Sequence, residues 1–260
     1  MQFARRWLPE IIATPLLPVL IAQGRRTRRI TPRLPEAAGP REGATDTLHD
    51  TAALTLLAVG ESPVAGVGVA LQQEAITAQL AAILSRHVMQ PVTWRAIGRN
   101  GVTAREAHAL LLPQVPQQPV DIVFVAFGVN DTTAFRPVAQ WRNDMRRLLL
   151  EIDRICTPGV ILLSGVPPMA HFPALPQPLR WVMGLKATAL DAAVRDLADV
   201  TSHIQAKLLY VPVSIDPADK SLMASDGYHA SAKGCTIWAG LIASAYVQHA
   251  NGSSQAAKGT

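Results

Sequence analysis

Hydrophobic runs of strand length alternate with longer amphipathic segments over most of this 260-residue chain. The nearly continuous apolar runs predict buried strands, because a strand covered on both faces does not alternate polar and apolar positions. The longer segments repeat apolar residues every three or four positions, as the core-facing side of a helix does. The predicted strands are 53–59, 91–97, 120–127, 159–166 and 207–213, and the predicted helices are 68–88, 103–112, 137–155, 179–203 and 231–247.

Strands that alternate with helices predict an α/β fold, with a parallel sheet covered by helices on both faces. Five such strands suit a flavodoxin-like three-layer sandwich with the strand order 2-1-3-4-5. We expect this domain over residues 51–250. A basic and apolar arm with a Pro-rich linker precedes it at 1–50, and a flexible polar tail follows at 251–260.

The positive charge of the chain is concentrated in the arm. The first 35 residues hold seven arginines and one glutamate, whereas the remainder holds 17 basic and 18 acidic residues. The body is therefore nearly neutral, which argues against a nucleic-acid-binding domain.

An apolar run at residues 7–23 lies between the two groups of arginines. It is shorter than the roughly 20 residues of a membrane-spanning helix, and it contains Glu10 and three prolines. Three interpretations remain: a segment packed on the domain or on a second copy of the chain, an interfacial anchor on anionic lipid, or a signal sequence. We favour packing, because prolines disrupt a continuous amphipathic helix. We accordingly expect a cytoplasmic protein, with peripheral membrane attachment as the alternative and secretion less favoured.

The cysteines and other potential ligands do not form a metal motif. Cys156 and Cys235 lie in helical patterns at a spacing that suits no metal site, so we expect two buried, reduced thiols. The pair Gly66 and Gly68 is too short a match for a dinucleotide-binding loop. The sequence therefore predicts neither a metal nor a cofactor.

Candidate chemistry begins at Ser62, which follows the first predicted strand. A side chain in this position lies outside the carboxyl end of a parallel strand, where such sheets place their active sites. Serine needs an adjacent base to act as a nucleophile. His229 is the candidate base, because Asp226 stands three residues before it and can orient its ring.

Four sequence blocks, at Ser62, Gly101, Asn130 and Asp226–His229, resemble the SGNH (GDSL-type) hydrolase family in order and spacing. The resemblance implies a catalytic triad of Ser62, Asp226 and His229. It also implies an oxyanion hole made by the backbone N–H groups of Ser62 and Gly101 and the side-chain amide of Asn130.

Two positions depart from the usual pattern of the family. Glu61 stands where the family usually has Asp, and Ala230 stands where it often has Pro. Neither change removes a catalytic group. With Glu61 in place of Asp, the question of how the turn that carries Ser62 is supported stays open.

The sequence indicates the pocket for the acyl chain less clearly than the triad. The candidate residues for its walls are Val64, Met169, His171, Phe172 and Trp181. We expect a serine hydrolase that cleaves small-molecule carboxylic esters with short or medium acyl chains through an acyl-enzyme. The alternatives are an acyltransferase or a carbohydrate O-acetyl esterase with the same site, and a non-catalytic, membrane-associated binding module with a degenerate site.

Overall fold

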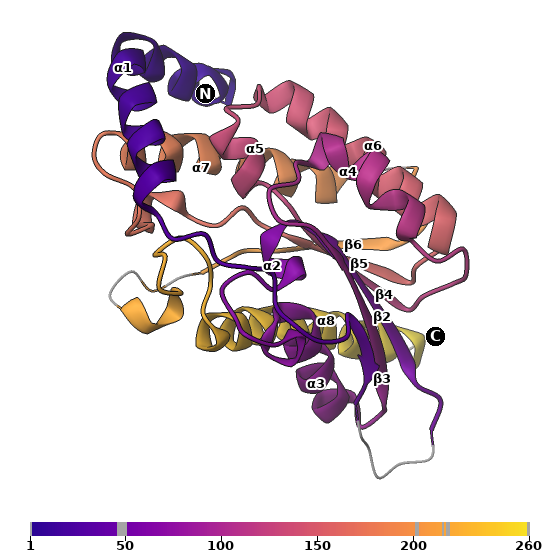
Figure 1. Cartoon of the computed structure of the whole chain (residues 1–260). Helices are drawn as coiled ribbons and strands as arrows, with labels where there is room; N and C mark the ends of the chain where they lie inside the picture. Colours follow the sequence, from indigo (N-terminus) through magenta and orange to yellow (C-terminus); the bar gives the residue numbers. More distant parts are fainter. Residues whose placement is uncertain (1, 46–50, 201–202, 215, 217–218, 259–260) are drawn as a thin grey trace.

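The computed structural model describes residues 2–45, 51–200, 203–214, 216 and 219–258. A six-stranded sheet lies between two layers of helices, with α3 and α8 on one face and α1, α4, α6 and α7 on the other (Figure 1). The strands are β1 (Glu42–Ala44), β2 (Leu54–Gly60), β3 (Val92–Gly98), β4 (Ile122–Ala126), β5 (Val160–Ser164) and β6 (Lys207–Val211). The helices are α1 (Gln2–Ile30), α2 (Ser62–Ala65), α3 (Ile76–Val88), α4 (Ala104–Leu110), α5 (Val129–Thr133), α6 (Val138–Cys156), α7 (Leu179–Val200) and α8 (Ala232–Lys258). Short 3₁₀ helices are η1 (Gln72–Glu74), η2 (Leu112–Gln114), η3 (Met169–His171) and η4 (Lys220–Leu222).

The strand order is β1-β3-β2-β4-β5-β6, and every pair except β1–β3 is parallel. Without β1 this is the predicted order, so the α/β prediction is confirmed. The edge strand β1 was not predicted, because its three exposed residues carry no apolar pattern; they join the sheet by antiparallel pairing with β3.

The register of the central strands brings three loops together. Gly60 at the end of β2 is opposite Gly98 of β3 and Ala126 of β4. Because the strands are parallel, the segments that follow these three residues leave the sheet at the same edge.

The predicted helix at 68–88 begins only at Ile76. Gly66 and Gly68 have φ angles of +77° and +104°, which are incompatible with a right-handed helix. The segment after α1 packs here, since Ala38 exchanges backbone hydrogen bonds with Ala70 and Gln72. The closing helix α8 extends beyond the predicted end at 247, to Lys258. Residues 46–50 of the predicted linker lie outside the described residues.

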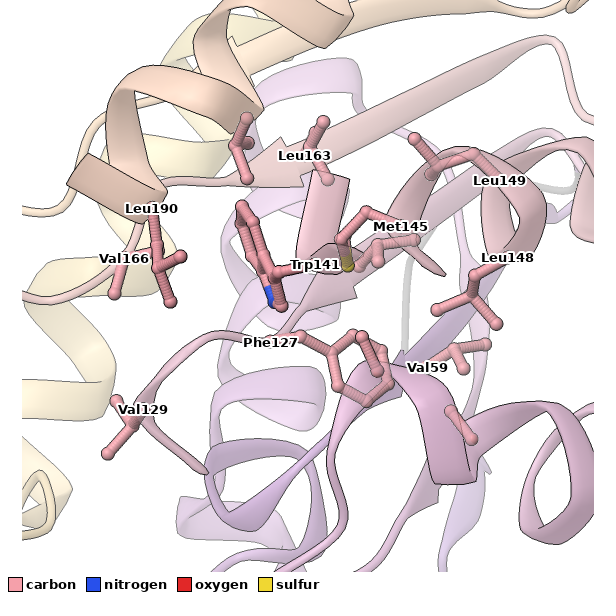
Figure 2. Close-up of a cluster of buried hydrophobic side chains, with 14 of the residues drawn as sticks. Val59, Phe127, Val129, Trp141, Met145, Leu148, Leu149, Leu163, Val166 and Leu190 are labelled. Carbon is pink, nitrogen blue, oxygen red and sulfur yellow. The ribbon is translucent and has the colours of Figure 1, made fainter. Parts of the chain in front are cut away.

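The larger core cluster lies between the sheet and α6 and α7 (Figure 2). Trp141 and Met145 of α6 point toward side chains of the central strands and of α7, and both are almost fully buried. The second cluster lies beneath α3 and α8 on the other face. Cys156 and Cys235 are buried free thiols, one in each cluster, as predicted.

The N-terminal helix α1 packs on α7 through one narrow stripe. Pro9, Ala13, Leu20 and Thr27 are its buried residues, and their spacing of four, seven and seven places them on one side of a helix. The expectation that three prolines would interrupt this segment is wrong, because α1 is assigned as helix through Pro9, Pro15 and Pro18. Figure 1 shows that the helix bends along its length, which is how a helix accommodates proline.

A buried ion pair holds α1 to the body. The ammonium of Lys186 on α7 bonds the carboxylate of Glu10, and its side chain is 0% exposed. The same ammonium lies 4.9 Å from the ring centre of Phe135. Loss of the carboxylate would therefore leave a desolvated cation without its counter-charge.

We expect Glu10→Gln to lower the free energy of unfolding by about 3 kcal/mol, because a buried charge that loses its partner is strongly destabilising. Chemical denaturation measures this change. The control is Glu151→Gln, whose partner Arg154 is exposed, and it should cost less than about 0.5 kcal/mol. Equal, small losses in both variants would contradict the importance of the pair.

Candidate active site

Ser62 lies at a sharp turn from strand to helix. β2 ends at Gly60, where an added Cβ would lie 2.6 Å from the carbonyl oxygen of Ala126 and from Val64, so only glycine fits. Glu61 follows, and Ser62 is the first residue of α2. The turn is tight and buried, with the Ser62 residue 5% exposed.

His229 and Asp226 form a hydrogen-bonded pair on the loop before α8. The distance between His229 Nδ1 and Asp226 Oδ2 is 2.6 Å. Asp226 Oδ1 also accepts from the backbone N–H groups of Tyr228 and His229, at 2.9 and 3.0 Å. Burial would raise the pKa of Asp226, but the hydrogen bonds, led by that of the His229 ring, hold it below its usual value. Asp226 is therefore an ionised acceptor for the imidazole at neutral pH.

Ser62 and His229 line the same small cavity, of about 50 Å³, together with Phe172 and Trp238. Among the residues that the structure describes, no hydrogen bond joins the Ser62 hydroxyl to the His229 ring. The structure thus brings together all three members of the predicted triad.

The two other predicted donors lie on the adjoining loops. Gly101 follows β3 with a φ of +81°, and nothing lies within 4 Å of the position where its Cβ would be. Asn130 lies in α5, and its Nδ2 donates to the carbonyl of Val102 at 3.0 Å. This bond orients the amide, and the same side chain also interacts with Glu61, whose pKa it lowers. Neither Gly101 nor Asn130 lines the two cavities at His229, although their neighbours Asn100 and Val129 do.

Glu61 connects the nucleophile turn to the loop after β4. Its two carboxylate oxygens accept from the backbone N–H groups of Val129 and Asn130, at 2.8 and 2.9 Å. Burial raises the pKa of Glu61 to about 8, and the two backbone hydrogen bonds offset part of this rise. Glu61 therefore supports the turn, which answers the question that this departure from the usual aspartate left open.

A second buried carboxylate connects the next pair of loops. Asp131 Oδ2 accepts from the backbone N–H of Ala104, the first residue of α4, at 3.0 Å. Burial raises the pKa of Asp131 to about 6. Together with the bond between Asn130 and Val102, this contact fixes α5 against the segment that contains Gly101.

A larger cavity of about 390 Å³ opens on the other side of His229. Its lining joins the Asp226–His229 loop to the end of α1 and the segment that follows it. The lining residues are Gly24, Thr27, Arg28, Thr31, Pro32, Arg33, Leu34, Asn100, Thr133, Leu175, Leu179, Met183, Asp226, Tyr228 and His229. The sequence did not predict that the end of α1 and the segment after it line a cavity. The excess of arginine over acidic residues in this segment was a signal that it has a role.

Of the five predicted pocket residues, Phe172 alone lines either of these two cavities. Val64 and Met169 are fully buried core residues, so they pack beneath the site. His171 and Trp181 are exposed outside both linings, because η3 and α7 direct them toward solvent. Tyr228, which the sequence did not single out, packs edge-on against Phe172 with ring centres 5.2 Å apart.

Within the described parts of the chain, no group of three His, Cys, Asp or Glu residues is arranged to hold a metal ion.

The sequence pattern of the GDSL-like lipase/acylhydrolase family matches residues 58–237, more than two thirds of the chain. The chain belongs to this family. The matched range contains the turn at Ser62 and the pair Asp226–His229, and it excludes α1 and the segment up to residue 57. Family membership supports a carboxylic ester hydrolase.

Solved structures with a similar fold are lipases and esterases of low sequence identity. A lipase from a goat rumen metagenome is 15% identical, with a TM-score of 0.58 over 74% of this chain and 97% of that one. An extracellular lipase from Streptomyces rimosus is 15% identical, with a TM-score of 0.53 over 74% and 100%. A carbohydrate esterase of family 2 from Corynascus thermopiles is 14% identical, with a TM-score of 0.56 over 79% and 69%. No curated protein sequence matches the chain significantly.

This GDSL-family protein should lose stability with rising pH through Glu61. The raised pKa means that folded Glu61 keeps its proton at pH values where the unfolded chain, with the ordinary value of 4.5, has lost it. The contribution is full below about pH 4.5 and is lost as pH rises through about 8. Between about pH 5 and about pH 8, the wild type should lose about 3 kcal/mol more than Glu61→Gln.

Chemical denaturation of both proteins across this range measures the difference. Groups that do not interact with Glu61 titrate alike in both proteins, so their contributions to the difference cancel. Parallel pH profiles for the two proteins would show that Glu61 is ionised in the folded state at neutral pH.

Proposed function

We propose that this GDSL-family protein hydrolyses carboxylic esters through an acyl-enzyme formed on Ser62. The observation that carries the proposal is the 2.6 Å contact between Asp226 Oδ2 and His229 Nδ1. His229 lines the same cavity as Ser62. An acid, a base and a hydroxyl in this order are the groups that acyl transfer needs.

In the first half of the reaction, Ser62 Oγ attacks the acyl carbon while His229 Nε2 accepts the hydroxyl proton. Because His229 Nδ1 faces the Asp226 carboxylate, its proton is held there and Nε2 is left as the acceptor. Collapse of the tetrahedral intermediate breaks the bond to the alcohol oxygen, which leaves with the proton from Nε2.

In the second half, water attacks the acyl carbon and transfers a proton to Nε2. The bond to Ser62 Oγ then breaks, the proton returns to Oγ, and the carboxylic acid leaves. Asp226 stabilises the positive charge that the imidazole carries in each half, because its lowered pKa keeps it ionised.

The negative charge of each intermediate falls on the former carbonyl oxygen. The donors proposed for it are the backbone N–H groups of Ser62 and Gly101 and the side-chain amide of Asn130. Glu61 and Val102 support this set, since they fix the backbone and side chain of Asn130 before any substrate arrives. Fixed donors of this kind are worth about 3–4 kcal/mol each in the transition state.

The cavities favour short to medium acyl chains. The space beside Ser62 is about 50 Å³, and the larger cavity beyond His229 is about 390 Å³, which is within the range of small-molecule sites. Tyr228 is the one aromatic side chain in the larger lining within the described residues, which offers little surface for sugar stacking. We therefore place a simple ester ahead of a carbohydrate ester, and water ahead of an alcohol as the acyl acceptor.

We also propose that α1 rests on an anionic membrane surface. Seven of the thirteen large apolar side chains that are exposed in the described residues belong to this helix, including Trp7, Ile11 and Leu17. Between Trp7 and Ile30, α1 is long and apolar enough to cross a membrane, judged by length and composition alone. Its packed stripe and its four arginines at 25, 26, 28 and 29 favour a position at the interface instead.

Ser62→Ala should lower kcat for 4-nitrophenyl hexanoate by at least about 10³-fold, because the nucleophilic oxygen is lost. The free energy of unfolding should stay within about 0.5 kcal/mol of the wild type. Ser164→Ala is a matched control, since Ser164 is another buried serine at the carboxyl end of a parallel strand. A fluorophosphonate should add its phosphonyl group to the wild type and not to Ser62→Ala, as read by mass spectrometry. Turnover by folded Ser62→Ala at the wild-type rate would refute the assignment.

The triple variant Ile11→Ser, Leu17→Ser and Ile21→Ser should bind vesicles of phosphatidylcholine and phosphatidylglycerol at least about tenfold more weakly than the wild type. Co-sedimentation measures this binding, and added salt should weaken it for the wild type. The control variant carries serine at Met89, Ile237 and Leu241, which are exposed apolar residues on other helices or their ends. If the wild type forms dimers that the triple variant cannot form, and neither binds vesicles, the face belongs to a second copy of the chain.

A further inference from the structure

The larger cavity at His229 has a wall that the family match does not include. Residues 24–34, from the end of α1 and the segment after it, supply seven of its fifteen lining residues. The family match begins at residue 58. Any selectivity that this wall confers is therefore a property of this chain's own N-terminal segment.

This wall is anchored at both ends. Before it, the side chain of Gln23 donates to the carbonyl of Gln177 at 2.7 Å and accepts from the N–H of Leu179 at 3.0 Å. After it, Glu36 accepts from the backbone N–H of Asn100 at 2.7 Å, on the loop that carries Gly101. The wall is thus preformed against α7 and against the proposed oxyanion loop.

The lining has an apolar part and a cationic part. Leu34, Leu175, Leu179 and Met183 supply hydrocarbon surface. Arg28 and Arg33 supply the two guanidinium groups of the lining.

Among the residues that the structure describes, neither arginine has a counter-ion. In the described parts of the chain, Arg28 and Arg33 form no ion pair. The one carboxylate of the lining, Asp226, is already bound to His229. Arg28 lies near enough to Tyr228 for its charge to lower the pKa of that phenol, against a larger rise caused by burial.

We infer that this cavity selects esters that carry a negatively charged group beside an apolar chain, with the anion bound by Arg28 and Arg33. The inference rests on the proposed ester hydrolysis at Ser62. An apolar lining with two unpaired guanidinium groups fits an amphiphile with a carboxylate or phosphate, because each fork donates two hydrogen bonds to such an oxygen pair.

The test compares three soluble esters. The first is 4-nitrophenyl hexanoate, which is neutral. The second is 4-nitrophenyl hydrogen adipate, whose acyl chain ends in a carboxylate. The third is 5-hexanoyloxy-2-nitrobenzoate, whose leaving group carries the carboxylate. For the wild type, kcat/KM should be about tenfold higher for at least one charged ester than for the neutral one. The preference should shrink when ionic strength rises from about 0.02 M to about 0.5 M, because both arginines are exposed to solvent.

In the double variant Arg28→Gln and Arg33→Gln, the ratio of charged to neutral kcat/KM should fall about tenfold, through KM rather than kcat. The matched control is Arg25→Gln and Arg26→Gln, which removes the same charge from the nearby end of α1, outside the cavity lining. The control should keep the wild-type ratio. A ratio that falls equally in both double variants would reflect the general field of the arm and would overturn the inference.

Binding to Ser62→Ala separates this inference from the proposed function. Calorimetry with hexyl hydrogen adipate should show binding that weakens about tenfold when Arg28→Gln and Arg33→Gln are added. If the wild type cleaves the neutral ester and shows no charge preference, the inference fails while the proposed function stands. If it cleaves none of the three esters, the proposed function fails, and the binding result then decides whether the cavity takes anions.

Two sources of the charged group share this chemistry, a soluble ester and a lipid. Binding of the adipate ester as a monomer supports the soluble ester. Binding only to vesicles that contain phosphatidylglycerol would overturn the assignment to a soluble ester.

Discussion

The buried carboxylate of Glu61 is the contact on which the geometry of the site depends. It accepts one backbone hydrogen bond on each oxygen, from Val129 and Asn130, and so holds the loop after β4 against the turn that presents Ser62. Burial of an acid is unfavourable unless its oxygens are satisfied, and these two N–H groups at the start of α5 satisfy them. Because the pKa of Glu61 is raised by burial, a change in its protonation alters the stability of the fold.

Three segments that are distant in sequence are assembled on this support. The sheet register places Gly60, Gly98 and Ala126 side by side, and the side chains of Asn130 and Asp131 then bind the loop after β3 through Val102 and Ala104. The Asp226–His229 pair arrives from a fourth segment, and its loop is closed by a glycine at φ +62° whose Cβ would approach Ala174. Hydrogen bonds between buried side chains and backbone groups, together with the Asp226–His229 contact, thus give the candidate site its shape.

The N-terminal helix adds a second layer of organisation outside the family match. A buried ammonium, Lys186, fixes α1 through Glu10, and Gln23 fixes its other end. Its packed stripe is narrow, so apolar residues remain on the solvent side while Arg28 borders the cavity. One helix therefore offers an exposed apolar surface, which we propose faces lipid, and a wall of the proposed substrate site.

The α/β fold, the order of the five parallel strands and the triad candidates could be predicted from the sequence, because these depend on local periodicity and on short blocks beside strand ends. Glu61 was visible only as a departure from a pattern; its partners, Val129 and Asn130, lie 68 and 69 residues away, and only the register brings them together. The pocket predictions at Val64, Met169, His171 and Trp181 depended on side-chain direction, which a loop's composition does not specify. Tertiary contacts with α7 determine where α1 lies. Its three prolines disfavour a helix, and the packing of its buried stripe on α7 offsets that cost.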